Sequence, residues 1–167
     1  MQAWLLSIML SLAPPQGSID ESVYDQFERY DSIAADLTAE VEQGPWLFSG
    51  PQADRRTALI MLSIMFMESG FHYGVDVGRI AGDGGRSVCV LQRMVGNSET
   101  PEGWDRVDLI RDRRKCIRSA LNLAGKCNGM CGGDWIKAYG SGSCSRGGKA
   151  AAKRWALYYR LRRRWMK

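Results

Sequence analysis

Residues 58–67 read ALIMLSIMFM, and Ser63 is the only polar side chain in this run. A helix that is apolar on every side is buried in a hydrophobic core, because none of its faces is suited to water. The run therefore predicts a buried helix from about Asp54 to Ser69. Around it we expect a mainly α fold, a helical domain built on this central helix.

Glu68 is the first charged residue after the apolar run, in the tetrapeptide Glu68-Ser69-Gly70-Phe71. A carboxyl group held against an apolar wall loses water, and desolvation raises its pKa. Enzymes use this effect to keep a carboxylic acid protonated near neutral pH, so that it can donate a proton. We therefore predict that Glu68 is a general acid. The alternative is that it caps the helix end or pairs with an arginine.

Two further segments belong with this helix end. Residues 82–92 read GDGGRSVCVLQ, and residues 138–142 read AYGSG. In this order, the three segments resemble the lytic transglycosylase and goose-type lysozyme superfamily, whose members cut the glycan strands of peptidoglycan. The resemblance covers roughly residues 53–145. It implies a lysozyme-like α+β fold, in which a small β-hairpin or irregular sheet forms a second lobe.

The resemblance also implies a reaction. The bond to be cut is the β-1,4 link between N-acetylmuramic acid and N-acetylglucosamine, with Glu68 as general acid and then general base. Lytic transglycosylases form 1,6-anhydro ends with this single carboxylate, and they need neither a metal nor a cofactor. Ser69, Ser87 and Gln92 are expected to bind the substrate. Tyr139 is expected to bind it too and to orient Glu68; a buried core tyrosine is the alternative.

Two other functions remain open. Goose-type lysozymes carry a Gly-Asp pair nine residues before the same glutamine, and Gly82-Asp83 has this spacing from Gln92. Asp83 is thus a candidate for the second carboxylate of an inverting hydrolase, which activates a water. Asp-Gly-Gly is also ordinary turn chemistry. The other alternative is a non-catalytic wall-binding or assembly protein that keeps the fold.

Three positions depart from the family pattern. Cys89 stands where the family has glycine, Gly140 where it has asparagine, and Met94 where goose-type lysozymes have a further aspartate. We expect the first departure to be the one that can reshape the sugar cleft, because glycine lets a backbone approach a ligand closely.

The net charge of +5 comes from the end of the chain. Nine basic residues and no acidic one follow Ser145, so the preceding residues carry 14 basic and 18 acidic side chains. Residues 148–167 place aromatic and basic side chains at helical spacing, which predicts a basic amphipathic helix. We expect its aromatic side chains to dock on the core and its arginines to stay in water. The alternative is attraction to an anionic wall polymer or membrane surface; no nucleic-acid partner is expected.

Residues 1–17 contain an apolar segment, Trp4 to Leu12, that is too short to span a bilayer. The next residues resemble a signal cleavage site, although no Lys or Arg precedes the segment and proline follows the site. We predict a signal peptide or an N-terminal apolar segment here, and one catalytic domain over residues 18–167. Peptidoglycan lies outside the cytoplasm. We therefore expect a protein that is exported to the periplasm or the medium, or a phage-encoded protein that acts on the cell wall.

Five cysteines and a single histidine match no common zinc pattern. Disulfides in an oxidising compartment explain the cysteines better. They are Cys89, Cys116, Cys127, Cys131 and Cys144. If the family geometry holds, Cys89 lies on the floor of the cleft and Cys144 follows the tyrosine segment, so the resemblance implies a Cys89–Cys144 bridge. Cys116 with Cys127 or Cys131 is a second pairing, which leaves one thiol over.

Hydrophobic spacing predicts the remaining helices. A capping box from Ser18 to Glu21 begins a helix that ends at Gly44-Pro45. Another helix runs from about Asp105 to Ala124, and the basic residues of 111–118 form its wet face.

Between and beyond these helices the chain is richer in glycine. Residues 72–103 contain short β-prone runs and hold the predicted small sheet. Residues 125–133 are predicted to be a loop, and Trp135 to Tyr139 a short helix that leads into the tyrosine segment.

Overall fold

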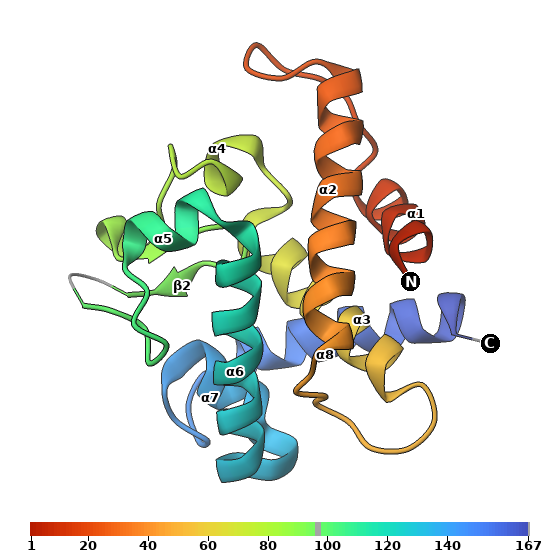
Figure 1. Cartoon of the computed structure of the whole chain (residues 1–167). Helices are drawn as coiled ribbons and strands as arrows, with labels where there is room; N and C mark the ends of the chain where they lie inside the picture. The colour runs from red at the N-terminus through yellow and green to blue at the C-terminus, as the bar shows by residue number, and fades with distance from the viewer. Residues whose placement is uncertain (96–97, 167) are drawn as a thin grey trace.

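The computed structural model describes residues 1–95 and 98–166 (Figure 1). The chain is mainly helical and carries a small antiparallel sheet, which confirms the predicted mainly α class. The α-helices are α1 (Gln2–Leu12), α2 (Val23–Glu42), α3 (Ala53–Ser69), α4 (Tyr73–Asp76), α5 (Arg106–Arg111), α6 (Arg113–Cys131), α7 (Trp135–Ser141) and α8 (Gly148–Trp165). Strands β1 (Ser87–Val88) and β2 (Arg93–Met94) pair, and short 3-10 helices are η1 (Asp83–Gly85) and η2 (Gly132–Asp134).

Helix α3 lies at the centre of the core, as its apolar run predicts. Every residue from Thr57 to Met65 is buried, and helices α1, α2 and α8 pack on this helix. The one polar residue of the run, Ser63, donates its hydroxyl to the Leu59 carbonyl at 2.8 Å, so it is satisfied inside the helix. The helix ends at Gly70 in the left-handed conformation, which puts Glu68 in the last turn at the edge of the core.

Helix α2 begins later than predicted. Its capping box is formed by Ser22 and Asp25, whose N–H donates to Ser22 Oγ at 3.1 Å. The predicted box from Ser18 to Glu21 is wrong, because those residues form a loop in which the Ser18 N–H donates to the Glu21 carbonyl. Val23, the first residue of α2, is 53% exposed.

The helix predicted from Asp105 to Ala124 is interrupted at Asp112. This residue has an extended backbone, and its Oδ1 accepts a hydrogen bond from the Arg114 N–H at 3.0 Å, so it ends α5 and caps α6. Aspartate side chains tend to hydrogen-bond to nearby backbone groups, and at Asp112 this bond takes the place of a continued helix.

Helix α6 also runs through much of the segment predicted to be a loop, 125–133, and ends at Cys131. Glycine is a poor helix former, but Gly125 lets another segment approach. A Cβ atom there would lie 3.3 Å from the Pro45 ring. Packing therefore overrides the local preference of the sequence.

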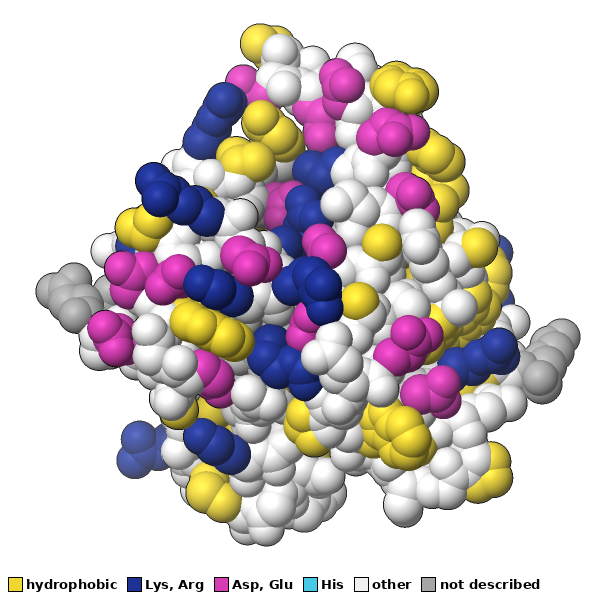
Figure 2. Space-filling model, viewed as in Figure 1, with side chains coloured by type: hydrophobic (Ala, Val, Ile, Leu, Met, Phe, Trp, Pro, Cys, Tyr) yellow, Lys and Arg dark blue, Asp and Glu magenta, His cyan; other side chains and the backbone are white. Residues whose placement is uncertain are grey.

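The basic residues at the start of α6 form ion pairs instead of the predicted wet face. Glu40 of α2 is only 4% exposed and accepts hydrogen bonds from Arg114 at 2.6 Å and Arg118 at 2.7 Å. Arg113 donates to the buried Asp76 at 2.9 Å. Figure 2 shows basic and acidic side chains interleaved along this part of the surface. Buried carboxylates need such partners, and this draws the arginines toward α2.

Two disulfides join Cys89 to Cys116 and Cys131 to Cys144. The predicted Cys89–Cys144 bridge is wrong, and so is the pairing of Cys116 with Cys127 or Cys131. The turn that carries Cys89 faces α6, where the Cα atom of Cys116 is 6.4 Å away. Cys127 is the free thiol; it is buried, and desolvation raises its pKa. Two disulfides suggest an oxidising, exported environment.

Helix α1 packs against α2 and α3, and its Leu5, Ile8 and Met9 are fully buried. The Trp4 indole N–H donates to the Trp165 carbonyl at 3.2 Å, so the two ends of the chain lie close together (Figure 1). In the stretches 1–95 and 98–166, we find no helix with both the length and the apolar character needed to cross a membrane.

Helix α8 docks by its aromatic side, as predicted. Tyr158 stacks on Phe48 with ring centroids 5.6 Å apart, and Trp155 meets Trp135 at 6.0 Å. Most of its arginines are exposed; these are Arg160, Arg162, Arg163 and Arg164. Arg154 is the exception, because it is buried on the docked side. Attraction of the exposed arginines to an anionic surface stays a prediction.

Candidate active site

A cleft of about 460 Å³ is bounded by the end of α3, the β-hairpin lobe, α7 and α8. Predicted site residues from three separate segments of the chain line it. They are Glu68, Asp83, Ser87, Gln92 and Tyr139. The fold therefore brings together five of the six side chains that the sequence singles out.

Ser69 is the predicted site residue that the structure places outside this lining. Its hydroxyl donates to the Met65 carbonyl at 2.9 Å and accepts the Phe71 N–H at 3.2 Å. Both interactions satisfy backbone groups at the end of α3. Ser69 thus shapes the helix end beside Glu68, and Phe71 packs in the core.

Glu68 is partly enclosed, with 21% of its side chain exposed, and its Oε1 accepts a hydrogen bond from Arg154 Nη2. The sequence predicted an apolar wall here; the structure adds a guanidinium from α8. The pairing with an arginine, which was the alternative, is thus present. It also offsets the unfavourable contact between a carboxylate and the negative end of the α3 dipole. The contact with Arg154 therefore occupies one oxygen of the carboxyl group that the sequence singles out.

The hairpin lobe is built on an unusual turn. Strands β1 and β2 are joined by residues 89–92, and within this turn Cys89 and Gln92 have left-handed φ angles of 61° and 48°. The Gln92 side chain donates to the Cys89 carbonyl at 3.3 Å and lies over Gly82, where a Cβ atom would collide with it. Non-glycine residues in this conformation cost free energy and cluster at functional sites.

Cys89 is the departure that was expected to reshape the sugar cleft, and this expectation is wrong. Its left-handed backbone is one that glycine adopts without strain. The side chain, however, is 1% exposed, is bonded to Cys116 and does not line the cleft. The cysteine therefore ties the back of the lobe to α6 and leaves the front open.

Asp83 stands at the exposed rim of the cleft, and its Oδ2 accepts a hydrogen bond from Ser87 Oγ at 2.6 Å. This hydrogen bond orients the Asp83 carboxylate. It also uses the proton of the Ser87 hydroxyl. Ser87 itself is 2% exposed, so its role is to hold the turn and to position Asp83 as much as to meet a ligand. The φ angle of Asp83 is left-handed as well, at 50°.

Tyr139 reaches the cleft from α7, but its hydroxyl has no partner. Within residues 1–95 and 98–166, no group accepts from or donates to the buried Tyr139 oxygen, so the predicted orienting hydrogen bond to Glu68 is not formed. Burial raises the pKa of Tyr139 strongly; Arg93 and Arg154 lower it, and Glu68 raises it further. The hydroxyl is therefore neutral at physiological pH.

Replacing Tyr139 with Phe is expected to leave stability unchanged or to raise it by about 1 kcal/mol, because a buried hydroxyl without a partner is costly. Urea unfolding measures the effect. A clear loss of stability would show that the hydroxyl already has a partner.

Two arginines of the lining, Arg93 and Arg154, were not predicted from the sequence. Arg93 is 8% exposed, and its Nε donates to Ser119 Oγ at 3.0 Å. Arg154 could have been found, since it lies three and four residues before Leu157 and Tyr158 on the buried stripe of α8. A charge placed on an apolar stripe is a better site candidate than a charge on the wet face.

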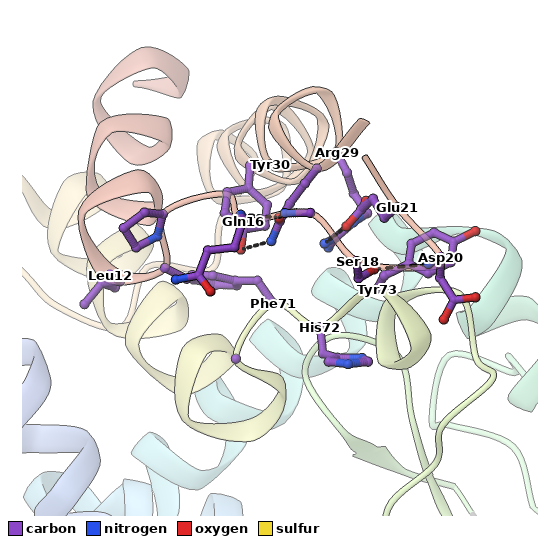
Figure 3. A pocket seen from close by; sticks show the side chains of 15 residues that line it. Leu12, Gln16, Ser18, Asp20, Glu21, Arg29, Tyr30, Phe71, His72 and Tyr73 are labelled. Carbon is purple, nitrogen blue, oxygen red and sulfur yellow. Dashed lines mark hydrogen bonds and ion pairs between the residues drawn. The ribbon is translucent and has the colours of Figure 1, made fainter. Parts of the chain in front are cut away.

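A second cavity, of about 490 Å³, lies beside the end of α1, the start of α2 and residues 70–73 (Figure 3). Glu21 and Arg29 point toward one another there, joined by hydrogen bonds of 2.6 and 2.8 Å. His72 is exposed, as expected, and its Nδ1 accepts the Gly74 N–H at 3.1 Å. None of the predicted site residues lines this cavity, so the Glu68 cleft is the better candidate.

No protein-family model, curated protein or solved structure matches the chain. What the cleft can do is therefore judged from its own residues and from the sequence segments that form it.

Proposed function

We propose that the protein cleaves the β-1,4 bond between N-acetylmuramic acid and N-acetylglucosamine in peptidoglycan, as a lytic transglycosylase. One observation carries this proposal. Glu68, Tyr139 and the pair Asp83 and Gln92 come from three segments that are far apart in the sequence, yet their side chains line one cleft. The cleft has the concave form and the few convergent polar groups that are typical of a ligand site.

In the proposed reaction Glu68 donates a proton to the glycosidic oxygen as the bond from that oxygen to C1 of the muramic acid breaks. The Glu68 carboxylate then accepts the proton of the C6 hydroxyl of the same sugar, and the C6 oxygen bonds to C1. The product carries a 1,6-anhydro ring, and Glu68 is protonated again. In this proposal the Gln92 side chain, which lines the cleft, hydrogen-bonds to the sugar.

An inverting hydrolase is a second candidate, because Asp83 lines the same cleft and its carboxylate is held by Ser87. There Asp83 would take a proton from a water that attacks C1. A non-catalytic wall-binding protein is the third, and the Glu68–Arg154 pair is the observation that favours it.

Mass spectrometry of the muropeptides released from purified peptidoglycan tests these functions, because anhydro ends and reducing ends differ by one water. We expect anhydro ends, and activity of Asp83→Asn within about threefold of the original protein, since general acid–base groups contribute about 10²–10⁴-fold when they act. Reducing ends, with a large loss in Asp83→Asn, would show a hydrolase. Binding to the wall without any released muropeptide would show a binding protein.

A further inference from the structure

Arg154 is a charged residue of the cleft that neither the motifs nor the proposed reaction uses. It extends from α8 to Glu68, and 11% of its side chain is exposed. It is thus set apart from the exposed arginines that follow it on the same helix. A guanidinium in this setting has given up most of its water, which requires a specific partner.

Gly140 provides the space that Arg154 occupies. A Cβ atom at residue 140 would lie 2.6 Å from Arg154 Nη1 and 3.2 Å from Nη2. Gly140 lies within helix α7, so the backbone does not require glycine there. What the missing side chain supplies is a slot for a guanidinium beside Glu68.

Arg154 has more N–H donors than its contact with Glu68 uses. A guanidinium carries five N–H groups in a fork that fits a carboxylate. Among the described residues, Glu68 alone accepts from it, through Nη2. The other nitrogens of Arg154 are not among the fully buried atoms that lack a partner, so they keep some contact with solvent. Charged or titratable groups around Glu68 are Arg154 from α8, Arg93 from β2, Tyr139 from α7 and Asp83 from η1.

We propose that Arg154 binds a carboxylate of the substrate in exchange for Glu68, so that Glu68 loses its counter-ion only when an acidic glycan fills the cleft. This inference rests on the proposed function. Arg154 is then a specificity and positioning residue. It favours glycans that contain muramic acid over neutral chitin-like glycans, and it couples recognition of the substrate to the release of the general acid.

The carboxylate in question has two sources in peptidoglycan. Muramic acid carries a lactyl group whose carboxylate is free in glycan stripped of peptides. In intact peptidoglycan the lactyl group continues into a stem peptide with carboxylates of its own. Chitin oligomers carry neither.

Calorimetry measures the affinity of the protein for three small ligands, and this tests the proposal independently of any catalytic turnover. They are N-acetylglucosaminyl-N-acetylmuramic acid with a free lactyl carboxylate, the same disaccharide with its stem peptide, and diacetylchitobiose. We expect at least one acidic ligand to bind about tenfold more tightly than chitobiose, because the charged hydrogen bond that forms with Arg154 is partly offset by the one to Glu68 that breaks. The first two ligands show which carboxylate is bound.

Four variants test whether Arg154 causes the preference. Arg154→Met is expected to reduce the preference to within about twofold, and Arg154→Gln, which can still donate to Glu68, serves if the Met variant does not fold. Arg160→Met removes an exposed charge from the same helix and should keep the preference. Glu68→Gln removes the competing carboxylate and should bind the acidic ligand more tightly, by roughly tenfold.

The results that would overturn the role of Arg154 differ from those that would overturn the proposed reaction. No preference in the original protein, or an unchanged preference in both Arg154 variants, would overturn the inference even if peptidoglycan is cleaved. A merely structural role for Arg154 would weaken chitobiose binding as much as acidic binding, and would overturn it too. If the original protein releases no muropeptide, the proposed reaction fails, while the binding preference is still measured.

Discussion

Glu68→Gln is expected to lower the release of muropeptides by about 10²- to 10⁴-fold, the contribution of a general acid–base group. The same carboxyl group would serve both steps of the proposed reaction, so its loss affects bond cleavage and ring closure together. Glutamine has almost the same shape and can still accept a hydrogen bond from Arg154, which preserves the fold. Turbidity clearing of purified peptidoglycan, together with mass spectrometry of the products, measures the effect.

The matched control is Glu28→Gln, which makes the same chemical change at an exposed position of α2. It should clear peptidoglycan like the original protein. Thermal unfolding of both variants checks that neither has lost its structure. A Glu68→Gln protein that clears at the original rate would remove the enzyme assignment, whatever its cleft binds.

Removing the Cys89–Cys116 bridge by a double Ala substitution is expected to destabilise the protein by about 3.5 kcal/mol in the loop-entropy model, which lowers the melting temperature by roughly 7–14 °C. The bridge closes a span of 27 residues in the sequence and joins the hairpin lobe to α6. Because the turn at Cys89 carries Gln92, we also expect activity to fall at temperatures where the fold persists.

A variant with Gly at residue 89 separates the cross-link from the backbone. Cys89 has a left-handed φ angle, which alanine adopts at a cost of about 1–2 kcal/mol and glycine without strain. Cys89→Gly with Cys116→Ala should therefore be more stable than the double Ala variant by about 1 kcal/mol. Equal stability of the two, or a peptide map that shows Cys89 bonded to another cysteine, would contradict the structure.

Much of the fold could be predicted from local patterns. The run at 58–67 indicated the central helix because burial on all sides leaves a continuous apolar stretch. The basic helix at the chain end was predicted from spacing, and its aromatic side docks as expected. Five of the six candidate site residues were chosen from short segments, and the cleft contains them.

The errors have a common origin in contacts between distant segments. Asp112 breaks a helix whose spacing looked continuous, and Gly125 stays helical because Pro45 packs on it. The arginines of α6 turn toward Glu40, which lies more than seventy residues earlier in the chain. Periodicity shows which face of an element is apolar. It does not show which charged side chains lie on the neighbouring element.

The sequence by itself determined the helical class, the buried helix that carries Glu68 and the residues that could form a polar cleft, because these follow from hydrophobic spacing and from the chemistry of short segments. Only the tertiary structure decided which cysteines pair, that the Tyr139 hydroxyl lacks a partner among the described residues, and that Arg154 enters the slot beside Gly140 to meet Glu68. Each of these depends on distances between atoms that are far apart along the chain. Such distances are set by how the helices pack, and no local pattern encodes them.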